Sequence, residues 1–174
     1  MNPLLIIHVA ISLVGIAFGL VVLPGMLASK RFDGLTLVFL TTTIATSLTG
    51  LLLPLNGFTP PVVVAILSLL VLALACLARY AYNLRGVWRA IYVVGATVAL
   101  YFNVFVLVVQ LFQKVAPLKA LAPTQSEPPF LIVQVLTLAF FVVLGIAALV
   151  KFHPESRRGG IDESKNPRSF RMSS

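Results

Sequence analysis

The stretch LLIIHVAISLVGIAFGLVVLPGML, residues 4–27, contains a single histidine and no Asp, Glu, Lys or Arg. A helix needs about 20 apolar residues to cross a hydrocarbon core of roughly 30 Å, and this run is long enough. A signal peptide would carry basic residues before a shorter apolar core, whereas here Lys30 and Arg31 follow the core. The run therefore predicts a retained transmembrane helix.

Four further apolar runs follow, over residues 35–55, 62–78, 87–112 and 130–150. Asp33 is placed to cap the second helix, and Thr59, which precedes two prolines, is placed to cap the third. From Lys151 onward the chain is polar, with Pro, Gly and Ser throughout. The sequence thus predicts an all-α integral membrane bundle of five transmembrane helices within residues 1–150, and a basic, disordered tail over residues 151–174.

The composition of the chain supports this class of protein. Of its 174 residues, 59% are hydrophobic and 10% are charged, whereas a soluble domain is about 45–50% apolar and about 25% charged. These values exclude a soluble globular enzyme, a disordered chain and a nucleic-acid-binding domain. The single cysteine, Cys76, excludes an internal disulfide framework.

The basic residues are divided unequally between the two sides of the predicted bundle. With five spans, the first loop, the third loop and the tail share one side, which holds eleven of the thirteen Lys and Arg residues. Because Lys and Arg accumulate on the cytoplasmic side, we expect the N-terminus outside, the C-terminus inside, and attraction of the inner side to anionic lipid. The outer side holds only Lys114 and Lys119.

Small and hydroxyl-bearing residues recur at helical spacing in several runs. Gly15 and Gly19 form a GxxxG pair in the first run. Such residues let helix backbones approach closely, since lipid gives helices no hydrophobic reason to associate. The pattern predicts close packing but leaves open whether the packing is within one chain or between two copies. The second run carries Thr42, Thr43, Thr46, Ser47, Thr49 and Gly50, and the fourth carries Gly95, Ala99 and Asn103.

Asn103 is the polar residue predicted to lie deepest. It is about nine residues from the end of the fourth run, or roughly 14 Å at 1.5 Å per residue. An unsatisfied amide in hydrocarbon costs several kcal/mol. We expect Asn103 to face the second span and bond a Thr or Ser hydroxyl there; contact with a ligand or ion is the functional alternative.

Four further polar residues are candidates for a pocket at the outer side. His8 and Gln134 have similar predicted depths, Gln110 is shallower, and Glu127 lies just outside the fifth span. The hypothesis is that all four converge and bind a quinone headgroup or form a proton relay, because an intramembrane ionisable residue is a functional candidate by default. The alternative is a hydrated or packed histidine.

Catalytic and metal-binding patterns are absent from the sequence. It contains no Walker motif, GxSxG, HExxH or Rossmann fingerprint. His8 and His153, the two histidines, belong to opposite sides of the membrane and cannot ligate one haem within a monomer. We therefore predict no catalytic residue and no metal ligand, and the sequence leans away from an enzyme without deciding the question.

Two segments carry a family resemblance. Residues 99–110, ALYFNVFVLVVQ, and residues 121–130, LAPTQSEPPF, resemble a recurrent pattern in small multi-span bacterial inner-membrane proteins, a group with no established activity. The resemblance covers most of residues 1–150 and implies a bacterial inner-membrane location. It transfers no catalytic residue, but it draws attention to Asn103, Gln110 and the loop over residues 124–129.

Three functions are compatible with these features. The leading expectation is a non-enzymatic accessory or assembly subunit, in a homo-oligomer or a larger membrane complex. The second is a binder of a quinone, a haem or another lipophilic ligand at the outer polar pocket. The third is a small oligomeric transporter, which would need a polar path through the bundle.

Overall fold

The computed structural model describes residues 3–53 and 60–153, and these residues form helices joined by short loops, with no strand among them. In chain order the helices are α1 (Pro3–Leu27), α2 (Asp33–Leu52), α3 (Pro60–Cys76), the single π-helical turn η1 (Leu77–Ala81), α4 (Val87–Lys114), α5 (Ala116–Leu121) and α6 (Pro128–Lys151). Five of the described helices are long and apolar enough to cross a membrane, when η1 is counted with α3. The prediction of an all-α fold with five long apolar helices is confirmed.

Several details of the helices differ from the predicted ones. α2 ends at Leu52, before residue 55, and α5 is a short helix that the sequence did not predict. The predicted cap at Asp33 is wrong, because Asp33 is the first residue of α2 and no side chain caps that helix. The predicted Thr59 cap and all but the start of the predicted tail, from residue 154 on, lie outside the described residues.

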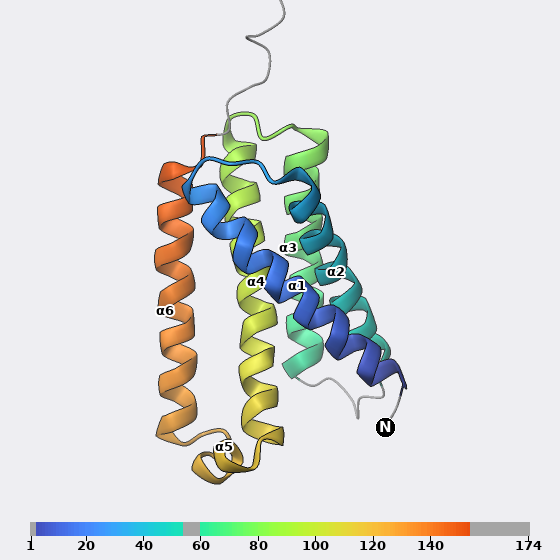
Figure 1. Ribbon diagram of the computed structural model, residues 1–174, viewed down its shortest axis with the longest axis vertical. Coiled ribbons are helices and arrows are strands. Elements are labelled where there is room, and N and C mark those ends of the chain that lie inside the picture. Colours follow the sequence, from blue (N-terminus) through green and yellow to red (C-terminus); the bar gives the residue numbers. More distant parts are fainter. Residues whose placement is uncertain (1–2, 54–59, 154–174) are drawn as a thin grey trace, which may run out of the picture.

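The helices run alternately up and down, and α4 contacts the other four long helices (Figure 1). α1 crosses the bundle obliquely, from beside α6 at one end to beside α2 at the other (Figure 1). We call the end where α1, α3 and α6 begin the His8 end, and the opposite end the Arg79 end. α4 is the most buried of the five long helices and α6 the least, so α6 leaves most of its apolar side chains exposed.

Two glycines let α1 lie close to its neighbours. A Cβ atom on Gly19 would lie 2.6 Å from Cδ1 of Leu100 and 2.9 Å from Cε2 of Phe39. A Cβ atom on Gly15 would lie 3.1 Å from Oγ1 of Thr42. The GxxxG pair therefore packs inside the chain, against α2 and α4, which settles the question that the sequence left open.

The first prediction tests this contact. Gly19→Ile should lower the free energy of unfolding by about 1–3 kcal/mol, because the added side chain has no room between Leu100 and Phe39. Ala17→Ile, on the exposed face of α1, should change it by less than about 0.5 kcal/mol. Thermal or denaturant unfolding of both variants in the same detergent measures the difference, and equal effects would contradict the packing.

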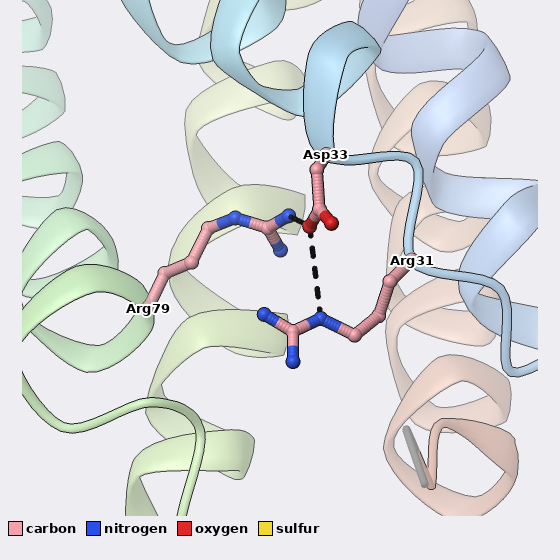
Figure 2. Close-up of polar contacts among 3 residues, drawn as sticks. All are labelled: Arg31, Asp33 and Arg79. Carbon is pink, nitrogen blue, oxygen red and sulfur yellow. Dashed lines mark hydrogen bonds and ion pairs between the residues drawn. The ribbon is translucent and has the colours of Figure 1, made fainter. Parts of the chain in front are cut away.

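Polar contacts tie the helices together at the Arg79 end. Arg79 lies on η1 with a side chain that is 3% exposed, and its Nη2 donates to Oδ1 of Asp33 at 2.5 Å. Arg31 approaches the same oxygen with Nε at 3.7 Å (Figure 2). The guanidinium of Arg79 also lies 5.2 Å from the ring centre of Tyr92, within the range of a cation–π interaction. The start of α2 is thereby joined to the end of the third span.

Two further side chains, those of Arg89 and Ser29, bond the end of α6. Arg89, in the first turn of α4, donates Nη1 to the carbonyl oxygen of Leu149 at 3.0 Å and to that of Phe152 at 2.5 Å. Ser29, just after α1, donates its hydroxyl to the carbonyl oxygen of Lys151 at 2.6 Å. A cation beside the last carbonyls of a helix is favourable, since those groups carry partial negative charge. This end of the bundle is therefore fixed by hydrogen bonds as well as by packing.

Candidate functional site

A cavity of about 140 Å³ lies between α1, α2, α3 and α4, towards the His8 end. Its apolar walls include Val64, Ala65, Phe102 and Val106. No Asp, Glu, Lys or Arg is among its described lining residues. Its polar side chains are His8 and Ser12 from α1, Thr46 and Ser47 from α2, Ser68 from α3, and Asn103 and Gln110 from α4. His8, Asn103 and Gln110, three of the five residues singled out in the sequence, thus share one cavity.

The hydroxyl groups of α2 are engaged by their own helix. Thr46 donates to the carbonyl oxygen of Thr42 at 2.9 Å, and Ser47 donates to that of Thr43 at 3.1 Å. A hydroxyl has one hydrogen and two lone pairs. Once the hydrogen is given to the backbone, each of these side chains can only accept a further hydrogen bond. The α2 wall of the cavity therefore offers acceptors.

The contact between His8 and Thr49 is the basis for inferring which imidazole nitrogen carries hydrogen. His8 Nδ1 lies 2.9 Å from Oγ1 of Thr49, and the same oxygen lies 2.7 Å from the carbonyl oxygen of Ala45. If the Thr49 hydrogen serves that carbonyl, as the α2 hydroxyls above do, Oγ1 accepts from Nδ1–H of His8, and we infer this tautomer. In a neutral imidazole only one nitrogen carries hydrogen, which leaves Nε2 as an acceptor.

Asn103 forms a hydrogen bond with a hydroxyl group of the second span, as the sequence predicted. Its Nδ2 donates to Oγ1 of Thr43 at 3.3 Å, and Asn103 is 7% exposed. The expected bond to a hydroxyl of the second span is confirmed. No hydrogen bond joins the amide oxygen of Asn103 to another described residue, and Asn103 lines the cavity. That oxygen is a second acceptor available to a ligand.

Ser68 is the most informative residue of the site. It is 3% exposed, and its buried hydroxyl has no hydrogen-bond partner in the described structure. Ser12 and Gln110 also line the cavity, and neither makes a side-chain hydrogen bond to another described residue. Leaving a buried polar group unsatisfied costs about 1–3 kcal/mol. The cavity therefore contains hydrogen-bonding groups that an occupant would satisfy.

Gln134 and Glu127 do not join this cavity. Gln134 lies between α6 and α4, where its Nε2 donates to the carbonyl oxygen of Phe105 at 3.3 Å. Glu127 lies in the loop before α6, where its Oε1 accepts from Thr124 N–H at 3.1 Å and from the Thr124 hydroxyl at 2.9 Å. The predicted convergence of four outer residues is therefore wrong for these two. Similar depth along different helices did not bring them to the same face.

The loop before α6 determines the pKa of the Glu127 carboxyl group. Partial desolvation would raise the pKa of Glu127, but hydrogen bonds from Thr124 and Ser126 outweigh this effect and hold that pKa below its ordinary value. The carboxylate is charged at neutral pH and is used to shape the loop. Its role in the described structure is thus local, at the start of α6.

Sequence reasoning missed Ser68 as a site residue. The signal was present, since Ser68 is the one hydroxyl-bearing residue in the apolar run over residues 62–78. A lone serine in such a run commonly bonds its own backbone, and only the fold shows that this one does not. Thr49 was assigned to helix packing, and its contact with His8 was not foreseen.

The comparisons with known proteins add no relative. No family model matches the chain, and no curated protein and no solved structure matches it. Among the described residues, no three His, Cys, Asp or Glu side chains come together in a way that could hold a metal ion. The site is therefore interpreted from its geometry alone.

The second prediction concerns the bond between Asn103 and Thr43. A double-mutant cycle with Asn103→Leu and Thr43→Val should give a coupling energy of about 0.6 kcal/mol, the average for interhelical hydrogen bonds in membranes. Unfolding in detergent measures all four proteins. A coupling energy of several kcal/mol would show that the bond holds the fold together, and a coupling energy of zero would show that the bond does not form.

Proposed function

We propose that this chain is an integral membrane protein that binds a small, uncharged ligand in the cavity enclosed by α1, α2, α3 and α4. The observation that carries the proposal is the cavity itself, because seven polar side chains line it and one of them, Ser68, has a buried hydroxyl with no partner among the described residues. Polar groups in hydrocarbon need internal partners. A bound molecule would supply them.

The dimensions and chemistry of the cavity limit the ligand. A buried cavity of about 150 Å³ is known to hold benzene, so about 140 Å³ suits a single ring. The headgroup of a quinone is of this size, whereas a porphyrin has four pyrrole rings and is far larger. The absence of charged residues from the described lining favours an uncharged ligand, because an unpaired charge in the membrane is costly.

The rest of the bundle supports binding over transport. The polar lining is confined to the His8 end, while Leu23, Met26 and Phe39 are buried, at most 1% exposed, towards the Arg79 end. A transporter needs a polar path to both sides of the membrane. The accessory or assembly role expected from the sequence is compatible with the cavity, and the ligand would then give that subunit a binding function.

We further propose that the protein spans a bacterial inner membrane, with the His8 end outside and the Arg79 end inside. The support is the charge distribution, since Lys30, Arg79, Arg89 and Lys151 all belong to the Arg79 end and basic residues accumulate in the cytoplasm. The cavity would then lie nearer to the outer face, and anionic lipid would contact the Arg79 end.

The third prediction tests this orientation. A reporter that is active only in the cytoplasm should be active when fused after Ser174, and one that is active only outside should be active when inserted near Thr124. Insertion near Asn56 should give the same result as insertion near Thr124. A tail found on the outer side would contradict the proposed orientation.

The fourth prediction tests ligand binding with phenol as the probe. Equilibrium dialysis of labelled phenol against the protein in nanodiscs, with empty nanodiscs as the blank, should show one saturable site. Ser68→Leu should abolish that site, because the larger side chain fills the cavity and removes the unpaired hydroxyl. Unfolding measurements should show that this variant is folded, so that lost binding reports the site and not a lost fold.

Thr41→Leu is the matched control. Thr41 lies on the same bundle but on the exposed face of α2, where its hydroxyl bonds the carbonyl oxygen of Leu37. This variant adds similar apolar bulk and should bind phenol as the parent does. Saturable binding that survives Ser68→Leu, or no saturable binding by the parent, would refute the proposal.

A further inference from the structure

We infer that the cavity selects a ring that bears a hydroxyl group able to donate a hydrogen bond, such as a phenol or a hydroquinone, over a ring that can only accept. The inference rests on the proposed function and specifies the chemical class of its ligand. The basis is a count of hydrogen-bonding capacity: the lone pairs and hydrogens of the lining residues that remain unused by hydrogen bonds within the protein.

One side of the cavity offers fixed acceptors. Thr46 and Ser47 give their hydrogens to carbonyl oxygens one turn earlier in α2, so only oxygen lone pairs remain. His8 is held by Thr49 with hydrogen on Nδ1, which leaves the lone pair of Nε2. Asn103 differs from these groups, because its described bond uses one hydrogen of Nδ2: its amide keeps an oxygen that can accept and a second N–H that can donate. Thr46, Ser47 and Nε2 of His8 cannot satisfy a carbonyl oxygen.

The remaining polar residues can adapt to either partner. The hydroxyls of Ser12 and Ser68 and the amide of Gln110 make no described side-chain hydrogen bond, so each can donate or accept. A ligand hydroxyl can therefore donate to the fixed acceptors and accept from one of these groups at the same time. A quinone carbonyl could bond only the adaptable groups or the free N–H of Asn103, and would leave the fixed acceptors facing an oxygen lone pair.

Discrimination of this kind is large when a site is buried. A site built to bond a substrate hydroxyl rejects an analogue that lacks it, because the polar groups of the site are then left unpaired. We therefore expect at least about a tenfold difference in affinity, which corresponds to one decade in Kd.

The experiment compares phenol with fluorobenzene, which has nearly the same shape and no hydrogen to donate. The dissociation constant of each probe is measured by equilibrium dialysis against nanodisc-embedded protein, with empty nanodiscs subtracted. The unmodified protein should bind phenol at least tenfold more tightly. Ser47→Ala and His8→Phe, which each remove one acceptor, should reduce the ratio of the two constants, and Thr41→Val on the exposed face of α2 should leave it unchanged.

The outcomes separate this inference from the function on which it rests. If both probes bind saturably with equal affinity, the donor preference is wrong and the ligand-binding cavity stands. If fluorobenzene binds more tightly than phenol, the assignment of the acceptors is wrong. If neither probe binds, the cavity holds water alone, and both the inference and the proposed function fail. A phenol preference that survives both acceptor variants would also overturn the inference, because the selectivity would then arise elsewhere.

Discussion

The close approach of α1 to α2 and α4 at Gly15 and Gly19 is the contact on which the rest of the bundle depends. Lipid tails are as apolar as the helices, so helix association relies on close packing and on internal hydrogen bonds. Gly19 meets the side chains of Leu100 and Phe39, and Gly15 meets Thr42 beside Asn103. From this contact towards the Arg79 end Leu23, Met26 and Phe39 fill the interior, and from it towards the His8 end Ser12 and His8 line the cavity.

The polar interior follows from the way in which α2 satisfies its own side chains. Four of its hydroxyl-bearing residues, Thr42, Thr46, Ser47 and Thr49, return their hydrogens to the helix backbone, which satisfies these donors inside a hydrophobic bundle. The same bonds leave oxygen lone pairs along the inner face, and His8 contacts that of Thr49. Asn103 donates to the hydroxyl oxygen of Thr43 on the same helix. The chemistry of the cavity is therefore set by a bonding pattern internal to one helix.

The sequence predicted the helices better than it predicted the site. Length and hydropathy were enough for the five spans, and the cost of a stranded amide was enough to give Asn103 a partner on α2. Depth along a helix does not fix the direction in which a side chain points, so Gln134 was placed with His8 although it bonds the backbone of α4. Glu127 is satisfied within its own loop, and Asp33 bonds Arg79 across the bundle; neither contact has a signature in the sequence.

The central claim is that a molecule the size of a single ring occupies the cavity lined by α1, α2, α3 and α4. Nuclear Overhauser effects between phenol ring protons and labelled methyl groups of the protein in nanodiscs test it most directly. The account predicts contacts to Ala65 and Val106, which line the cavity, and their loss in Ser68→Leu. Contacts confined to lipid-facing methyl groups such as those of Leu70 and Val143, which are 60% and 68% exposed, would contradict it.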